Sequence, residues 1–233
     1  MALVDGYGAV SGPVTAVLPG LGVSGYMQPA VRDLAAHVAG QVLLFNGPGF
    51  GGSDPVSRWS TVGVVAEAVR RFLQDLGQPV AALVGQSTGC LVAARVARAF
   101  PSASLVLVSP VVDPVQRSLL KFGAAWLRDG QRERAGLLAV EAPEWWRGRR
   151  QLRPLLKSCL SSSLDELLAD LPYPVTVVRG GSDPMARHEW VVGLADRPGG
   201  RIVVVPGGSH AFMFRRPDLL YRAVSAAGGL GRA

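Results

Sequence analysis

Short apolar runs alternate with longer segments of helical character along most of this 233-residue chain. The runs are rich in Val, Leu and Ala, and turns that contain Gly, Pro, Ser or Asn separate them, a pattern typical of buried strands. Strands that alternate with helices predict a mostly parallel sheet with helices on both faces, which is the α/β class. The expected strands are residues 14–18, 41–46, 80–84, 104–109, 174–179 and 201–205.

The segment from residue 60 to 76 shows the clearest helical pattern. Ser60 or Thr61 can cap its N-terminus, and Gly77 with the following Pro79 ends it. Its apolar residues recur at helical spacing, which predicts a stripe that faces the core. The predicted stripe consists of Val65, Ala68, Val69, Phe72 and Leu76.

Between residues 114 and 171 the alternation of strands and helices stops. This predicts a core made of residues 1–113 and 172–233, with a helical lid, 114–171, inserted after the strand at 104–109. Such a lid would cover the carboxyl edge of the sheet, exclude water and shape a substrate pocket. Four short helices are expected in it, at about 115–128, 130–141, 143–157 and 163–170.

The pentapeptide Gly85-Gln86-Ser87-Thr88-Gly89 lies between an apolar run and a helix-like run from Leu91 to Phe100. A serine hydroxyl is a poor nucleophile unless its surroundings activate it with a base. A sharp turn from strand to helix projects the serine outward, and the crowding of that turn explains the glycines on both sides. The context therefore favours a nucleophile elbow at Ser87 over a purely structural turn.

Two loops that follow expected strands carry the base and the acid that such a serine needs. His210 follows the last expected strand, and Asp183 follows the strand before it. Loops beyond the carboxyl ends of parallel strands are where α/β proteins build their sites. Asp113, which follows the strand before the insertion, is the alternative acid. His37 lies in a helical run and is expected to face outward.

The chain order serine, aspartate, histidine is that of the α/β-hydrolase superfamily, and further segments resemble that family. Val17-Leu18-Pro19-Gly20-Leu21-Gly22 is similar to its strand and oxyanion loop, and the segment 45–54 resembles the glycine-rich loop after the next strand. The sequence segments Gly-Gly-Ser-Asp at Asp183 and Pro-Gly-Gly-Ser-His at His210 also resemble the family's acid and base loops. Few residues precede the first expected strand, so the antiparallel hairpin that often opens this fold must be short or missing.

Two positions depart from the family's pattern: Pro19 stands where histidine is usual, and Asn46 stands where aspartate is usual. Neither position belongs to the triad. The resemblance implies an oxyanion hole formed by the backbone N–H groups of Leu21 and Thr88, whose chemistry does not depend on side-chain identity. Thr88 stands where a larger apolar residue is common, so it can widen the pocket or offer a hydroxyl.

The resemblance implies a cofactor-independent serine hydrolase with a triad of Ser87, His210 and Asp183 and no metal. The expected reaction transfers an acyl group from an ester, thioester or related bond to water, in bacterial small-molecule metabolism. Three alternatives stay open because the fold does not determine the reaction. They are a non-hydrolytic biosynthetic enzyme (elimination, cyclisation or acyl transfer), a ligand-binding protein, and a stand-alone thioesterase for carrier-bound acyl groups.

The expected lid carries three of the five tryptophans, Trp126, Trp145 and Trp146, which are candidates to line the substrate pocket. It also carries basic residues with no acid between positions 145 and 157. These are Arg147, Arg149, Arg150, Arg153 and Lys157. They indicate either a solvated helix face or attraction of an anionic small-molecule substrate or an acidic carrier protein.

Composition narrows the function classes. The formal net charge is +7, but the basic residues are scattered and follow no recognition motif, so nucleic-acid binding is not expected. Cys90 and Cys159 provide no disulfide framework, and Cys90 is expected to be a packing residue. Neither a signal peptide nor a membrane span is expected, which favours a cytoplasmic location. Nothing in the pattern indicates an oligomeric state.

Overall fold

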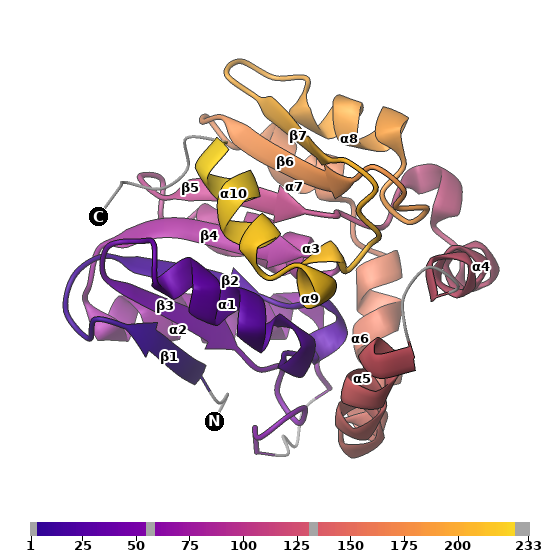
Figure 1. Cartoon of the computed structure of the whole chain (residues 1–233), viewed down its shortest axis with the longest axis horizontal. Helices are drawn as coiled ribbons and strands as arrows, with labels where there is room; N and C mark the ends of the chain where they lie inside the picture. The colour runs from indigo at the N-terminus through magenta and orange to yellow at the C-terminus, as the bar shows by residue number, and fades with distance from the viewer. Residues whose placement is uncertain (1–3, 55–58, 131–134, 227–233) are drawn as a thin grey trace.

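A seven-stranded sheet forms the centre of the part of the chain that the structure describes (Figure 1). This computed structural model describes residues 4–54, 59–130 and 135–226. The strand order is β1-β3-β2-β4-β5-β6-β7, and β1 is antiparallel to β3 whereas the other neighbours are parallel. The strands are β1 (Val4–Gly8), β2 (Val14–Leu18), β3 (Gln41–Phe45), β4 (Val80–Gln86), β5 (Ser104–Val108), β6 (Val175–Gly180) and β7 (Arg201–Val205). The predicted α/β fold is confirmed, and the opening antiparallel element is the short strand β1.

Helices cover both faces of this sheet (Figure 1). Leu105 and Leu107 of β5 pack on one face, and Val106 and Val108 pack on the other. The first face carries α2 (Val62–Leu76), α3 (Gly89–Ala97), α7 (Leu164–Ala169) and α8 (His188–Ala195). The second face carries α1 (Gln28–Ala35), α9 (Phe212–Arg215) and α10 (Asp218–Ala226). Burial on both faces explains why the strands read as continuous apolar runs.

Helix α2 begins and ends as predicted, but the face that it turns to the core overlaps only in part with the predicted stripe: Val69 is buried, and Val65 and Leu76 pack against the core. Thr61 Oγ1 accepts a hydrogen bond from the Val64 N–H at 3.2 Å, and Gly77 ends the helix in the left-handed conformation. The fully buried residues are Val62, Ala66, Val69 and Leu73. The prediction that Ala68 and Phe72 face the core is wrong, because Ala68 is exposed and Phe72 is 38% exposed. The helix has apolar residues on more than one side, and its contacts with α3 and with α6 (Arg149–Leu160) decide which of them are buried.

The insertion between β5 and β6 is helical, as predicted. It contains η3 (Pro114–Gln116), α4 (Leu119–Gly130), α5 (Ala135–Arg147), α6 (Arg149–Leu160) and α7. Residues 131–134, at the start of the predicted helix 130–141, lie outside the described residues. Helices α4, α5 and α6 stand beyond the carboxyl ends of the parallel strands, at the right of Figure 1, whereas α7 packs on α3. Among the described helices, none is long and apolar enough to cross a membrane.

Candidate active site

Ser87 lies in the turn that joins the end of β4 to the start of α3. Its φ of 55° is in the left-handed region, which residues other than glycine rarely adopt. The flanking glycines are required because the backbone is crowded. A Cβ on Gly89 would lie 2.1 Å from the Leu18 carbonyl oxygen, and a Cβ on Gly85 would lie 2.7 Å from the Cys90 Cα. The pentapeptide therefore forms the strained strand-to-helix turn that its glycine spacing predicted.

Three side chains from three separate loops form a continuous chain of hydrogen bonds. Ser87 Oγ lies 2.9 Å from His210 Nε2, and His210 Nδ1 lies 2.9 Å from Asp183 Oδ2. The other carboxylate oxygen of Asp183 accepts hydrogen bonds from the N–H groups of Met185 at 2.8 Å and Ala186 at 3.1 Å. All three side chains are buried. The structure thus brings together the serine, histidine and aspartate that the sequence singled out.

The charges of this buried group determine where its protons lie. Burial alone would raise the pKa of Asp183, but attraction to His210 and hydrogen bonds from His210 and the backbone hold it below its usual value. Burial alone would lower the pKa of His210, but the Asp183 carboxylate raises it above its usual value, with help from Asp129 and Glu141. Because an ionised carboxylate only accepts, Nδ1 carries the proton and donates to Asp183. Nε2 is therefore free to accept the Ser87 proton.

The alternative acid and the first histidine have other partners. Asp113 Oδ1 accepts a hydrogen bond from the Val115 N–H at 2.9 Å, and Asp113 Oδ2 lies 3.5 Å from Arg187 Nη1. His37 is partly exposed and stacks on Tyr221, with ring centroids 4.3 Å apart. The prediction favoured Asp183 over Asp113, and the geometry agrees with it.

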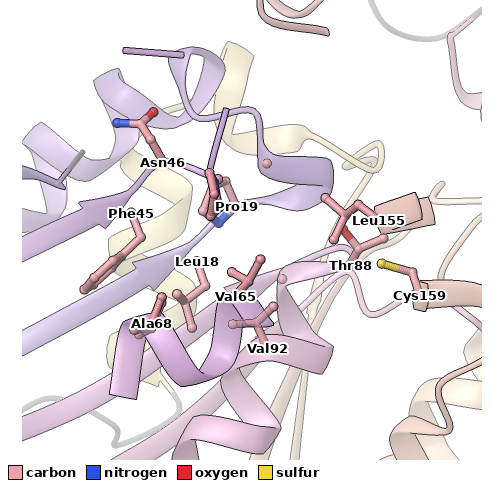
Figure 2. A pocket seen from close by; sticks show the side chains of 15 residues that line it. Leu18, Pro19, Phe45, Asn46, Val65, Ala68, Thr88, Val92, Leu155 and Cys159 are labelled. Atoms are coloured by element: carbon pink, nitrogen blue, oxygen red, sulfur yellow. The ribbon is translucent and has the colours of Figure 1, made fainter. Parts of the chain in front are cut away.

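The predicted oxyanion donors are not equivalent. The Leu21 N–H donates to Thr88 Oγ1 at 2.6 Å, so a side-chain hydroxyl already occupies this donor. The Thr88 N–H donates to no protein acceptor within the described residues. Figure 2 shows the Thr88 side chain beside Leu155 and Cys159 of α6, where it lines a second, apolar cavity. The Leu21 N–H can therefore reach another acceptor only if the Thr88 hydroxyl is displaced.

Tyr26 supports the loop that contains Gly20 and Leu21, a contact that the sequence did not directly indicate. Its buried hydroxyl accepts a hydrogen bond from the Gly20 N–H at 3.4 Å and donates to Gln86 Oε1. Burial raises the pKa of Tyr26, so the phenol stays protonated and can donate. Pro19, which stands where the family usually has histidine, has no side-chain hydrogen-bonding group. Tyr26 therefore stiffens this loop in a different way. The sequence offered one indirect signal: the polar Gln86 at the end of an apolar strand needs a buried hydrogen-bond partner, which is Tyr26.

A cavity of about 50 Å³ lies against Ser87 and His210. Trp126 and Trp145 line it, with ring centroids 6.0 Å apart in an edge-to-face arrangement. Trp146 does not line it, because its side chain is 70% exposed and lies under the Arg149 guanidinium. The prediction for Trp146 is therefore wrong. Consecutive residues of a helix differ by roughly 100° in direction, so Trp145 and Trp146 cannot both face the same cavity.

The basic residues of α6 line a different groove, with a volume of about 690 Å³. Its described lining includes Trp59, Arg149, Arg150, Arg153 and Lys157, and it includes neither a carboxylate nor a triad residue. Within the described part of the chain, the cavity at Ser87 has no basic residue other than His210 in its lining. Any attraction of an anion by the predicted basic run therefore acts outside the cavity that contains Ser87.

Two buried carboxylates of the insertion hold loops of the site. Asp129 Oδ1 of α4 accepts a hydrogen bond from the backbone N–H of His210 at 3.0 Å. Glu144 of α5 accepts from the N–H groups of Ser24 at 3.1 Å and Gly25 at 3.0 Å. The sequence indicated neither residue, because a charged residue in a helical segment normally faces solvent.

The two thiols are not competing nucleophiles. Cys90 and Cys159 are both buried, and burial raises the pKa of Cys159 to about 12 and also raises that of Cys90. Both therefore stay protonated, and a protonated thiol is a poor nucleophile and metal ligand. Among the described residues, no group of three or more His, Cys, Asp or Glu side chains is arranged to hold a metal ion.

Comparison with known proteins identifies the family. The profile of the Alpha/beta hydrolase family matches residues 17–223, and the chain belongs to this family. The polyketide synthase ThaQ of Burkholderia thailandensis is 28% identical over 92% of this chain. An uncharacterised protein of Mycobacterium tuberculosis is 32% identical over 90% of this chain. This chain spans 12% of the length of the synthase and 66% of the length of the mycobacterial protein.

The fold is also similar to that of solved structures. A hydrolase from Pseudomonas aeruginosa superposes with a TM-score of 0.78 at 22% sequence identity, and the match covers 98% of this chain and 93% of that protein. At this level of identity the likeness supports the fold rather than a particular substrate.

Proposed function

We propose that the protein is a serine hydrolase that cleaves an ester, thioester or related acyl bond. The observation that carries the proposal is the continuous series of hydrogen bonds from Ser87 through His210 to Asp183. Ser87 lies in a strained turn at the carboxyl end of the central strand β4. Nucleophile, base and orienting acid within hydrogen-bond reach are the arrangement that activates a serine. Membership of the alpha/beta hydrolase family supports the same reading.

The first half of the reaction forms an acyl-enzyme. Ser87 Oγ attacks the carbonyl carbon of the substrate, and His210 Nε2 takes the hydroxyl proton. The Asp183 carboxylate stabilises the imidazolium that forms, and the Thr88 N–H at the start of α3 donates to the developing oxyanion. The tetrahedral intermediate then collapses: the bond to the leaving group breaks, and His210 gives its proton to that group.

The second half repeats these steps with water as the nucleophile. His210 Nε2 takes a proton from water, the hydroxide oxygen bonds to the acyl carbon, and the bond to Ser87 Oγ breaks. The proton on His210 returns to Ser87, and a carboxylic acid is released. Trp126, Trp145 and Phe122 line the cavity and favour a small apolar or aromatic acyl group.

A fluorophosphonate probe and p-nitrophenyl acetate test the proposal. Intact mass should show one adduct per chain, and the Ser87→Ala variant should show none. Ester turnover should fall by several orders of magnitude in that variant, because triad members act as a unit. Ser102→Ala is the matched control, because it makes the same change at an exposed serine outside the cavity at Ser87, and it should keep both the adduct and the turnover. Unchanged turnover in Ser87→Ala would contradict the covalent mechanism.

The same ester separates hydrolysis from the non-hydrolytic alternative. A hydrolase should turn over p-nitrophenyl acetate many times, and acetate formed in labelled water should carry ¹⁸O. If the closed lid keeps water away from the acyl-serine, release of p-nitrophenol should stop after one equivalent per enzyme. That burst without a steady state would favour a lyase or acyltransferase.

A thioesterase for carrier-bound acyl groups is the second candidate. It is supported by the similarity to a polyketide synthase and by the groove of basic residues on α6, which can attract an acidic carrier. If it is correct, an acyl group on an acyl carrier protein should be hydrolysed with a higher kcat/KM than the same acyl group on N-acetylcysteamine. Replacing Arg150 and Arg153 with Gln should remove that difference and leave the small thioester unaffected. Equal kcat/KM for both substrates would contradict this candidate.

A further inference from the structure

The helical insertion closes tightly over Ser87. The cavity beneath it has a volume of about 50 Å³, and side chains of α4 and α5 form part of its wall. At the corner between α5 and α6, a Cβ on Gly148 would lie 2.2 Å from the Phe50 ring, so the insertion touches the core closely there. The positions of α4 and α5 therefore help to determine the shape of the cavity at Ser87.

The contact between Asp129 and His210 ties α4 to the catalytic base. Asp129 is 4% exposed, and its Oδ1 accepts the backbone N–H of a residue that follows it by 81 positions in the chain. A buried carboxylate is costly unless its oxygens accept hydrogen bonds, so this contact favours the closed position of α4. Displacement of α4 would remove the acceptor and loosen the loop that holds the imidazole.

The contact between Glu144 and the segment after the oxyanion loop ties α5 to the opposite side of the site. The two carboxylate oxygens of Glu144 accept hydrogen bonds from two successive N–H groups, those of Ser24 and Gly25. A Cβ at position 25 would lie 2.5 Å from Glu144 Oε1, so only glycine allows this approach. Gly20 and Leu21 lie just upstream in the same loop.

We infer that Asp129 and Glu144 are positioning residues through which the closed lid completes the active site. Asp129 orients the loop of the base, and Glu144 holds the oxyanion loop. The inference rests on the proposed function, since it takes His210 to be the base and the 20–25 segment to be the oxyanion loop. The lid is then part of the catalytic machinery rather than only a cover.

The charged groups that face His210 define the expected pH dependence. They are Asp183 from the loop after β6, Asp129 from α4 and Glu141 from α5, and each raises the pKa of the imidazole. Removing the charge of Asp129 should therefore lower the pKa of His210. The acid limb of the rate profile should move to lower pH, because the neutral imidazole persists there.

The first experiment measures fluorophosphonate labelling and kcat/KM for p-nitrophenyl acetate against pH. Asp129→Asn keeps an acceptor oxygen and removes the charge, so its acid limb should move to lower pH, with a plateau within roughly tenfold of wild type. Asp129→Ala also removes the acceptor, so its plateau should fall by roughly 10- to 100-fold. Asp170→Asn, a change in an exposed carboxylate of the same insertion, should leave the profile unchanged.

The second experiment separates kcat from KM for Glu144→Gln. An amide has one acceptor oxygen, so one of the two backbone donors loses its partner. We expect kcat to fall by roughly tenfold, KM to change by less than about threefold and the acid limb to stay in place. Gly25→Ala displaces the same carboxylate and should reproduce this signature. Glu166→Gln, at an exposed position of the insertion, is the control.

Folding and the base can be followed without turnover. Circular dichroism melts show whether each variant is folded, and NMR titration resolves the ring protons of only three histidines, His37, His188 and His210. A wild-type plateau in folded Asp129→Ala would overturn the positioning role of Asp129, and a wild-type His210 titration in folded Asp129→Asn would overturn its effect on the pKa of the base. Wild-type kcat in folded Glu144→Gln would overturn the positioning role of Glu144. In either case loss of labelling in Ser87→Ala would still support the proposed function, whereas retained turnover in Ser87→Ala would contradict the function itself.

Discussion

Replacing Thr88 with Val tests how the oxyanion hole works. Valine has nearly the shape of threonine but lacks the hydroxyl that now accepts the Leu21 N–H at 2.6 Å. The Thr88 backbone N–H, the other expected donor, is unaffected by the change. In the variant the Leu21 N–H has no side-chain acceptor and can donate directly to the substrate oxygen.

The expected increase in kcat/KM follows from the hydrogen bond between Leu21 and Thr88 that the substrate no longer has to displace. A typical hydrogen bond contributes about 0.5–1.5 kcal/mol net, so kcat/KM should rise by about 2- to 12-fold. The full value of one oxyanion donor, about 2.7–4 kcal/mol, is the upper limit. The free protein should lose stability, because an unpaired buried N–H costs about 1–3 kcal/mol. For a chain of this size each kcal/mol lowers Tm by roughly 2–4 °C.

The assay combines kcat/KM for p-nitrophenyl acetate with a thermal melt. Thr88→Val should be faster and less stable than the wild type, a combination that a general packing defect would not produce. Thr88→Ser keeps the hydroxyl and should stay within about twofold of wild type in rate. A slower Thr88→Val that is still folded would refute the reasoning, because the hydroxyl would then assist the reaction rather than compete with it.

Three further outcomes are expected. Asp183→Asn should lower kcat by about 10⁴-fold because the imidazole loses its orienting acceptor, whereas Asp113→Asn should lower Tm but leave kcat/KM within about threefold. The kcat/KM of the wild type should fall as the pH drops through the pKa of His210, which is raised above its usual value, because the protonated imidazole cannot accept the serine proton. Trp126→Ala should raise KM for an aromatic ester by roughly tenfold, and Trp146→Ala should not, as steady-state kinetics can show.

The sequence alone determined the features that depend on neighbouring residues. The elbow at Ser87 could be predicted because the strand and the helix lie directly on either side of it, and because Gly85 is required by the turn itself, where a Cβ would meet the backbone of Gly89 and Cys90. The second glycine, Gly89, is required by the close approach of Leu18 from a neighbouring strand. The loops of Asp183 and His210 could be predicted because each directly follows an apolar strand, and parallel strands end at the same edge of a sheet. The α/β fold followed from the alternation of strands and helices.

Only the tertiary structure decided the features that join distant segments. The neighbours that pack against each helix decide which face of α2 is buried. They also decide that Trp145 lines the cavity and that Trp146 lies outside it. The contact of Thr88 with Leu21 joins residues 67 positions apart, and the contact of Glu144 with Ser24 joins residues 120 positions apart. The local pattern of residues carries no information on contacts between segments so far apart in the sequence. A carboxylate that is buried against a backbone N–H has the same sequence signal as one that faces water, and only the folded chain distinguishes the two.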